Sequence, residues 1–170
     1  GAIIALNDEE GKLFKIYTDN RPPSIGYRFN KGGDYEDLCN DGKNWYALKS
    51  NGNLSKIENQ FTDSMRSTEF KFPLKAKFNF ESIFHDPANN RLVLLCKDCG
   101  NTDGKVLGYS FDLGKSETDS ISNFNLDLSG LISNPIGNNE TLKPSAAAYH
   151  PLTGVLFVIA SVNSLLIIAD

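Results

Sequence analysis

The chain alternates short apolar runs with turns rich in Gly, Asn and Asp, a pattern typical of β-strands joined by hairpins. One unit of this pattern starts at Asp34–Leu38, again at Asn79–Ile83 and again at Lys143–Ala147. Each start is followed by a polar turn and an apolar run, Trp45–Leu48, Leu92–Leu95 or Val155–Val158. A repeat of about 45 residues made of short strands predicts an all-β fold, a β-propeller of four-stranded antiparallel blades.

The repeat divides the chain into about four blades, two complete and two partial. Residues 33–78 and 79–142 each supply four strands, whereas residues 1–32 lack an innermost strand and residues 143–170 lack an outermost one. The expected strands are 3–6, 13–17, 24–29, 35–40, 44–49, 54–58, 68–72, 80–85, 91–96, 105–112, 121–128, 144–150, 155–159 and 164–169. We expect one β-propeller domain over residues 1–170 that forms part of a larger ring.

Partial blades at both ends have a physical consequence. Each blade of a propeller buries its apolar faces against its neighbours, so an open arc exposes apolar faces and unpaired strand edges. Further blades of the same protein, or other copies of the chain, are therefore expected to complete the ring.

Composition narrows the function classes. The 170 residues are 40% hydrophobic and 22% charged, as in ordinary globular proteins. The net charge is −4 and the basic residues are scattered singly, which argues against nucleic-acid binding. The longest apolar run, Leu165–Ala169, is far too short to span a membrane. No signal-peptide pattern opens the sequence, so any export signal is expected upstream.

Cys96 and Cys99 form a CxxC motif, and Cys39 is the third cysteine. The motif is compatible with a redox pair, half of a zinc site or a disulfide at the end of a strand. The sequence favours a simpler interpretation, one buried strand cysteine and one loop cysteine. The histidines, His85 and His150, fall at turn positions of the repeat, where solvated histidines are common.

The candidate site rests on two glutamates at the same repeat position, Glu36 and Glu81. Equivalent positions of successive blades converge on the propeller axis, so the two carboxylates should repel unless they share a cation, a lysine or a proton. Calcium is the natural cation because it prefers hard oxygen ligands. Further oxygens are expected from Asp37, Asp8, Asp34 and Asn79. Two alternatives remain open: the glutamates accept hydrogen bonds from backbone N–H groups of the adjacent blade, or they act in general acid/base catalysis.

Several sequence segments resemble the SdiA-regulated family of bacterial β-propellers. They are Asn79–Ile83 with His85–Pro87 and Arg91–Lys97, then Lys143–Ala146 continuing through His150–Gly154 to Ser164–Leu166. The resemblance, shared with phytase-like, esterase-like and gluconolactonase-like propellers, implies about six blades in an exported or lipid-anchored protein. It also implies that Glu36 and Glu81 match inner-strand glutamates, which in some related propellers face a calcium-containing channel. The third copy departs from this pattern, with Ser145 in place of Glu.

These observations favour a non-enzymatic binding or scaffold propeller of the bacterial cell envelope, periplasmic or in the outer envelope. Its channel mouth is expected to hold calcium or a small polar ligand, with Glu36 and Glu81 as the metal ligands. The alternative is a calcium-dependent hydrolase of the phosphoesterase or lactonase type, in which the metal activates water. A third class is a protein-interaction platform that uses the loops of one rim.

Overall fold

The computed structural model describes residues 1–19, 25–74, 77–101, 104–115, 121–131 and 141–169. These residues form an all-β fold of four antiparallel sheets, which confirms the predicted fold class. The strands are β1 (Ala2–Leu6), β2 (Lys12–Tyr17), β3 (Ile25–Arg28), β4 (Tyr35–Asn40), β5 (Trp45–Lys49), β6 (Leu54–Glu58), β7 (Arg66–Phe70), β8 (Phe80–Asp86), β9 (Arg91–Cys96), β10 (Lys105–Asp112), β11 (Ile121–Asp127), β12 (Ala146–Tyr149), β13 (Leu156–Ala160) and β14 (Leu165–Ala169). One turn of 3₁₀-helix, η1 (Ser129–Leu131), is the only helix within this part of the chain, and it is too short to cross a membrane.

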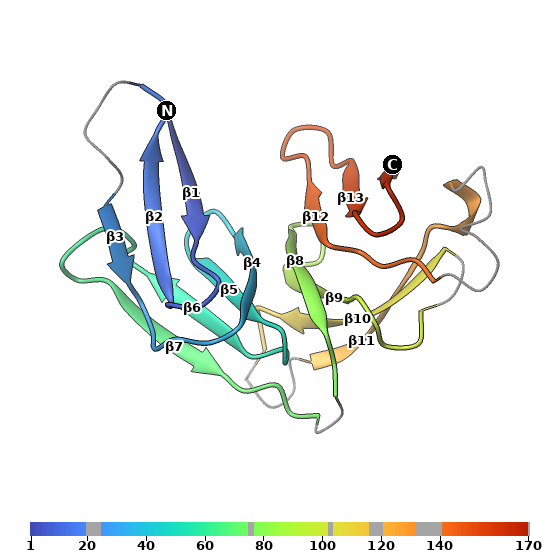
Figure 1. Cartoon of the computed structure of the whole chain (residues 1–170), viewed down its shortest axis with the longest axis horizontal. Helices are drawn as coiled ribbons and strands as arrows, with labels where there is room; N and C mark the ends of the chain where they lie inside the picture. The colour runs from blue at the N-terminus through green and yellow to red at the C-terminus, as the bar shows by residue number, and fades with distance from the viewer. Residues whose placement is uncertain (20–24, 75–76, 102–103, 116–120, 132–140, 170) are drawn as a thin grey trace.

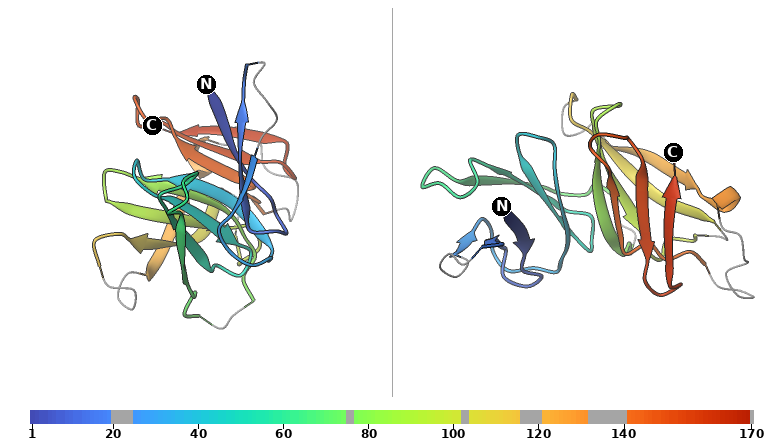
Figure 2. Two further views of the ribbon diagram at one scale, coloured as in Figure 1. Left: turned by 90° about the vertical axis from the view of Figure 1, so that its left-hand side faces the viewer. Right: turned by 90° about the horizontal axis from the view of Figure 1, so that it is seen from above.

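Each sheet is a meander of consecutive strands. The orders are β1-β2-β3, β4-β5-β6-β7, β8-β9-β10-β11 and β12-β13-β14. The sheets follow one another around the molecule in chain order, and β4, β8 and β12 lie side by side at its centre (Figures 1 and 2). These three strands are therefore the innermost strands of their blades.

Most strands lie within a residue or two of the expected positions. The clearest error is β7, which begins at Arg66, two residues before the predicted start at Thr68. β12 begins at Ala146, two residues after the predicted start at Pro144. Residue 24, the first of another predicted strand, lies outside the described residues. The blade limits 1–32, 33–78, 79–142 and 143–170 stay a prediction.

Repeated aspartates at the ends of inner strands close the hairpins that follow. Asp41 Oδ1 accepts the backbone N–H groups of Lys43 and Asn44 at 2.8 and 2.6 Å. Asp86, at the corresponding end of β8, accepts the Asn89 N–H at 3.3 Å and the Asn89 side-chain amide at 2.8 Å. Such local hydrogen bonds replace those that the turn backbone cannot make with itself.

The core lies between the sheets, in three apolar clusters. In β9, Leu92 and Leu94 belong to the cluster shared with the second sheet, while Val93 and Leu95 belong to the cluster shared with the fourth. Successive side chains of a strand point to opposite faces, so a strand between two sheets has to be apolar at every position. This explains the unbroken apolar run Leu92–Leu95 that marks the repeat.

The two end sheets carry exposed apolar side chains. Ile3 and Ile16, which are exposed register partners, lie on the first sheet. Ile159 and Leu166 form a similar exposed pair on the last sheet, beside exposed Ile168. This agrees with the expectation that a blade without a neighbour leaves apolar surface open to solvent.

Gly108 in β10 provides a test of how tightly the third sheet is built. A Cβ atom at this position would overlap the Leu94 carbonyl oxygen on β9. Since backbone atoms cannot move aside cheaply, we expect Gly108→Ala to lower the free energy of unfolding by about 3 kcal/mol. Urea denaturation measures this loss.

Gly130→Ala is the matched control, because a Cβ there meets nothing within 4 Å. Its effect should stay below about 0.5 kcal/mol. Equal stability of the two variants would contradict the close approach of β9 and β10.

Candidate functional site

Glu36 and Glu81 occupy matching irregularities in two inner strands. The pairing of β4 with β5 shifts register between Tyr35 and Asp37, and the pairing of β8 with β9 shifts between Phe80 and Ser82. Each glutamate is therefore the extra residue of a β-bulge. Bulges change the direction of a side chain and are common beside functional sites.

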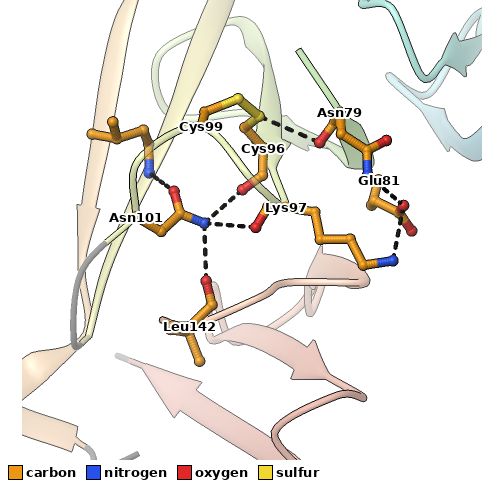
Figure 3. Close-up of a disulfide and its surroundings, with 8 residues drawn as sticks. Asn79, Glu81, Cys96, Lys97, Cys99, Asn101 and Leu142 are labelled. Carbon is orange, nitrogen blue, oxygen red and sulfur yellow. Dashed lines mark hydrogen bonds and ion pairs between the residues drawn. A yellow bond between two sulfur atoms is a disulfide. The ribbon is translucent and has the colours of Figure 1, made fainter. Parts of the chain in front are cut away.

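Lys97 neutralises the second of these glutamates. Its Nζ lies 3.0 Å from Glu81 Oε1, and the same oxygen accepts the Asn79 side-chain amide at 3.3 Å (Figure 3). Of the partners that the sequence allowed for converging carboxylates, a lysine is the one present at Glu81. We did not single out Lys97 from the sequence. The available signal was its position two residues after the apolar run Leu92–Leu95, where the previous blade has Ser50.

Glu36 sits among groups of its own charge. Burial raises the pKa of Glu36, and the negative charges of Glu81 and Asp34 and, more weakly, Asp8 raise it further, while Lys97 acts in the opposite direction. We call these four acids, Asp8, Asp34, Glu36 and Glu81, the carboxylate cluster. Asp8 also contributes a backbone oxygen that accepts the Tyr35 N–H at 2.7 Å.

Calcium has only a partial set of ligands here. The ion takes six to eight oxygens, whereas Glu81 is already bound to an ammonium group. Among the described residues, no group of three or more His, Cys, Asp or Glu side chains is arranged to hold a metal ion. Calcium binding by Glu36 and Glu81 stays a prediction, and nothing in the arrangement adds Asp37 to their ligands.

Asp37 instead joins two blades. Its Oδ2 accepts the backbone N–H of Ile83 on β8 at 2.9 Å, and its Oδ1 accepts the N–H of Leu38 at 2.8 Å. Burial raises the pKa of Asp37 to about 6, although these two hydrogen bonds act to lower it. The backbone contact between blades that we considered for the glutamates is thus made by their neighbour, Asp37.

A groove lies at the opposite ends of the inner strands. The groove has a volume of about 790 Å³ and is lined by the last residues of β4, β8 and β12 and by the turns that follow them. We call it the axial groove. Its side chains include Asn40, Trp45, His85, Asp86, Tyr149 and His150. Glu36 and Glu81, each the second residue of its strand, lie toward the other end.

The polar walls of the axial groove are held in place by contacts behind them. Asp86 Oδ2 accepts a hydrogen bond from Arg91 Nε at 2.8 Å. Burial acts to raise the pKa of Asp86, but hydrogen bonds from Asn89 and Arg91 outweigh it and leave that pKa lowered. The Tyr149 ring packs edge-on against Phe84, with 5.4 Å between ring centroids. These contacts restrain Asp86 and Tyr149 in the wall of the groove.

Both histidines line this groove, which the sequence did not predict. His85 lies within β8 rather than in a turn, and His150 directly follows β12. His150 Nδ1 accepts the Thr153 N–H at 3.3 Å, so its other ring nitrogen carries the proton when the ring is neutral. The usable signal was the recurrence of His before Asp-Pro or Pro at equivalent strand ends.

The CxxC motif forms a disulfide between Cys96 and Cys99. The interpretation as two independent cysteines is therefore wrong, and the strand-end disulfide is correct. Cys96 is fully buried at the end of β9, and Cys99 is half-buried in the loop beyond it. Cys39 is the free cysteine of the described residues.

Comparison with solved structures supports the propeller fold. The chain is similar to the β-propeller domain of Cps50 (Swd1) from Myceliophteria thermophila, with a TM-score of 0.56 and 10% sequence identity. The match covers 98% of this chain and 49% of that one, so the chain spans about half the length of the matched propeller domain. No family model and no curated protein matches the sequence. The fold is thus a β-propeller, and the SdiA-regulated family stays a prediction.

Asp37 gives a prediction about pH. Its pKa of about 6 lies above its ordinary value of 3.8, so the folded chain holds this proton more tightly than the unfolded chain. The contribution of Asp37 to stability is therefore complete below its ordinary pKa and is lost as the pH rises through 6. Relative to Asp37→Asn, the wild type should gain free energy of unfolding when the pH falls from about 7.5 to about 5.

Urea denaturation at both pH values measures this difference, and comparison of the two proteins cancels the other titrating groups. Exposed Asp63→Asn is the control and should track the wild type at both pH values. A gap between wild type and Asp37→Asn that does not change with pH would refute the assignment.

Proposed function

We propose that the protein is a non-enzymatic binding propeller whose axial groove receives a small polar ligand or a polar segment of a partner protein. The observation that carries the proposal is the groove itself, about 790 Å³ in volume and lined from three successive blades. Binding sites of this kind are concave and largely preformed, with aromatic walls and a few fixed polar groups. Trp45, Tyr149 and the two imidazoles supply these features.

The state of the groove's carboxylates favours binding over catalysis. A general base works best with a pKa near the working pH and a free oxygen. Asp86 instead has a lowered pKa and is bound to Arg91 and Asn89. Asp41 accepts a hydrogen bond from the Tyr46 hydroxyl at 2.8 Å in addition to two backbone N–H groups. These acids are used to shape the wall.

The cellular setting is proposed from the resemblance alone. The sequence segments around Glu81 and His150 resemble the SdiA-regulated family, which implies an exported or lipid-anchored protein of the bacterial cell envelope. A disulfide is compatible with an oxidising compartment such as the periplasm.

A calcium-dependent hydrolase is the second candidate. The observation in its favour is the like-charged surrounding of Glu36, whose pKa is raised by burial and then by Glu81 and Asp34. Such an environment attracts cations. The Lys97 ammonium on Glu81 weakens this attraction, which is why we place the axial groove first.

The two candidates make opposite predictions for one set of variants. Small polar metabolites and polar peptides that raise the melting temperature of the wild type are titrated by calorimetry against His85→Ala, Glu36→Gln and Leu152→Ala. The groove proposal expects about a tenfold loss of affinity in His85→Ala and unchanged affinity in Glu36→Gln. Leu152, which is 90% exposed and absent from the groove lining, is the control.

Calcium titration of chelator-treated protein, with phosphate-ester and lactone hydrolysis assays, completes the test. Calcium binding and hydrolysis that disappear together in Glu36→Gln would overturn the groove proposal in favour of the hydrolase. Loss of binding in Leu152→Ala equal to that in His85→Ala would also remove the groove as the site.

A further inference from the structure

The disulfide closes a small ring at a junction of three segments. Cys96 ends β9, and the ring contains Lys97 and Asp98 before it returns to Cys99 (Figure 3). Lys97 reaches Glu81 on β8 at 3.0 Å. Asp98 Oδ2 lies 3.3 Å from the Nζ of Lys143, which belongs to the segment before β12.

Asn101, just beyond the ring, fixes its position. Its side-chain amide donates to the carbonyl oxygens of Cys96, Lys97 and Leu142 at 2.8, 3.2 and 2.9 Å, as Figure 3 shows. Its Oδ1 accepts the Leu107 N–H of β10 at 3.0 Å. Asn101 is itself buried. The ring therefore connects the third sheet, the carboxylate cluster and the approach to the fourth sheet.

This disulfide is not well explained as a means of stabilising the whole fold. The stabilisation that a disulfide gives through the unfolded chain grows with the length of the loop it closes, and this loop is among the shortest that can form. The start of the ring is also held without it, because Phe80 pairs with Cys96 and the Lys97 N–H donates to the Asn79 oxygen at 2.8 Å. What the ring adds is a covalent restraint on the two residues that it contains, Lys97 and Asp98.

The fold can also accommodate the reduced form of Cys96. Cys96 Sγ lies 3.3 Å from the Asn79 carbonyl oxygen. A disulfide sulfur has no hydrogen to donate, but a thiol at this position would donate to that oxygen. Reduction therefore leaves no unsatisfied buried thiol at Cys96.

We propose that Cys96 and Cys99 are a redox-active pair that exchanges with a dithiol and controls whether Lys97 neutralises Glu81. A thiolate of the dithiol attacks the Sγ of Cys99, the more exposed of the two cysteines, and forms a mixed disulfide while the Cys96–Cys99 bond breaks. Cys96 leaves as a thiolate and takes up a proton. The second thiol of the donor then attacks the mixed disulfide, releases Cys99 and leaves the donor oxidised, so two electrons and two protons pass to the protein.

The consequence falls on the carboxylate cluster. In the oxidised protein the ring holds the Lys97 ammonium on Glu81. Once the ring opens, hydrogen bonds alone restrain the backbone of Lys97, so its segment gains freedom and the ion pair loosens. Glu81 then joins Glu36 and Asp34 without a fixed counter-charge. This inference does not depend on the groove proposal, because none of these residues lines the groove.

The test uses lysine acetylation of the intact chain, read by mass spectrometry before and after reduction with dithiothreitol. We expect Lys97 to be acetylated severalfold faster in the reduced protein. Lys49 is the internal control, because it ends β5 and its ion pair, 3.4 Å to Glu69, lies in the second sheet. In Glu81→Gln, Lys97 should react fast in both redox states, which separates release of the ion pair from general loosening.

Reduction of the folded protein with dithiothreitol, followed by unfolding and thiol alkylation, accompanies the labelling, together with circular dichroism of the folded forms. We expect alkylation of Cys39 alone without the reductant and of all three cysteines after it, with an unchanged circular dichroism spectrum for the folded forms. Three reactive thiols before reduction, reduction only after unfolding, or equal Lys97 labelling in both states would each overturn the proposal. Cys99→Ala, which fixes the open ring without a reductant, should reproduce the labelling of the reduced wild type.

Discussion

The packing of each sheet against its neighbours on both faces is the constraint on which the fold depends. β9 shows it most directly, since Leu92 and Val93 are adjacent in sequence yet belong to different apolar clusters. The same requirement places β4, β8 and β12 side by side, because sheets that share two faces can only fan around a common line. In the first and last sheets of this chain, by contrast, Ile16 and Leu166 are exposed.

The sequence predicted the features that recur at equivalent positions of the repeat, and it did not predict contacts that occur in one blade alone. Glu36 and Glu81 could be paired by their repeat position, and the structure places both at β-bulges near the centre. Lys97 could not be assigned to Glu81 in advance, because the third copy has Ser145 instead of a glutamate and no lysine recurs at this position. The bond from Ile83 to Asp37 likewise depends on the distance between two sheets, which no pattern along one chain encodes.

The two ends of the inner strands have different physical characters. At one end, four acids form the carboxylate cluster beside the ammonium of Lys97, and the pKa of Glu36 is raised by burial and by its neighbours. At the other end, Asp86 is neutralised by Arg91 and becomes part of a fixed wall beside Tyr149. Carboxylates without a counter-charge can bind a cation or a proton. A wall whose polar groups are already hydrogen-bonded can instead discriminate between ligands by their shape. The strand direction shared by β4 and β8 keeps these properties apart.

The axial groove and the Cys96–Cys99 disulfide differ in how much they depend on further blades of a complete propeller. The axial groove is bounded by three inner strands, and the chain spans about half of the matched propeller domain, so whatever lies across the axis would shape the remaining wall. The segment closed by the Cys96–Cys99 disulfide and the adjacent Asn101 contact β8, β10 and the segment before β12, which are consecutive parts of one chain. The ion pair between Lys97 and Glu81 is formed entirely within the third sheet. The proposed redox effect on this ion pair is therefore local, because it involves contacts of the third sheet and the segment that follows it.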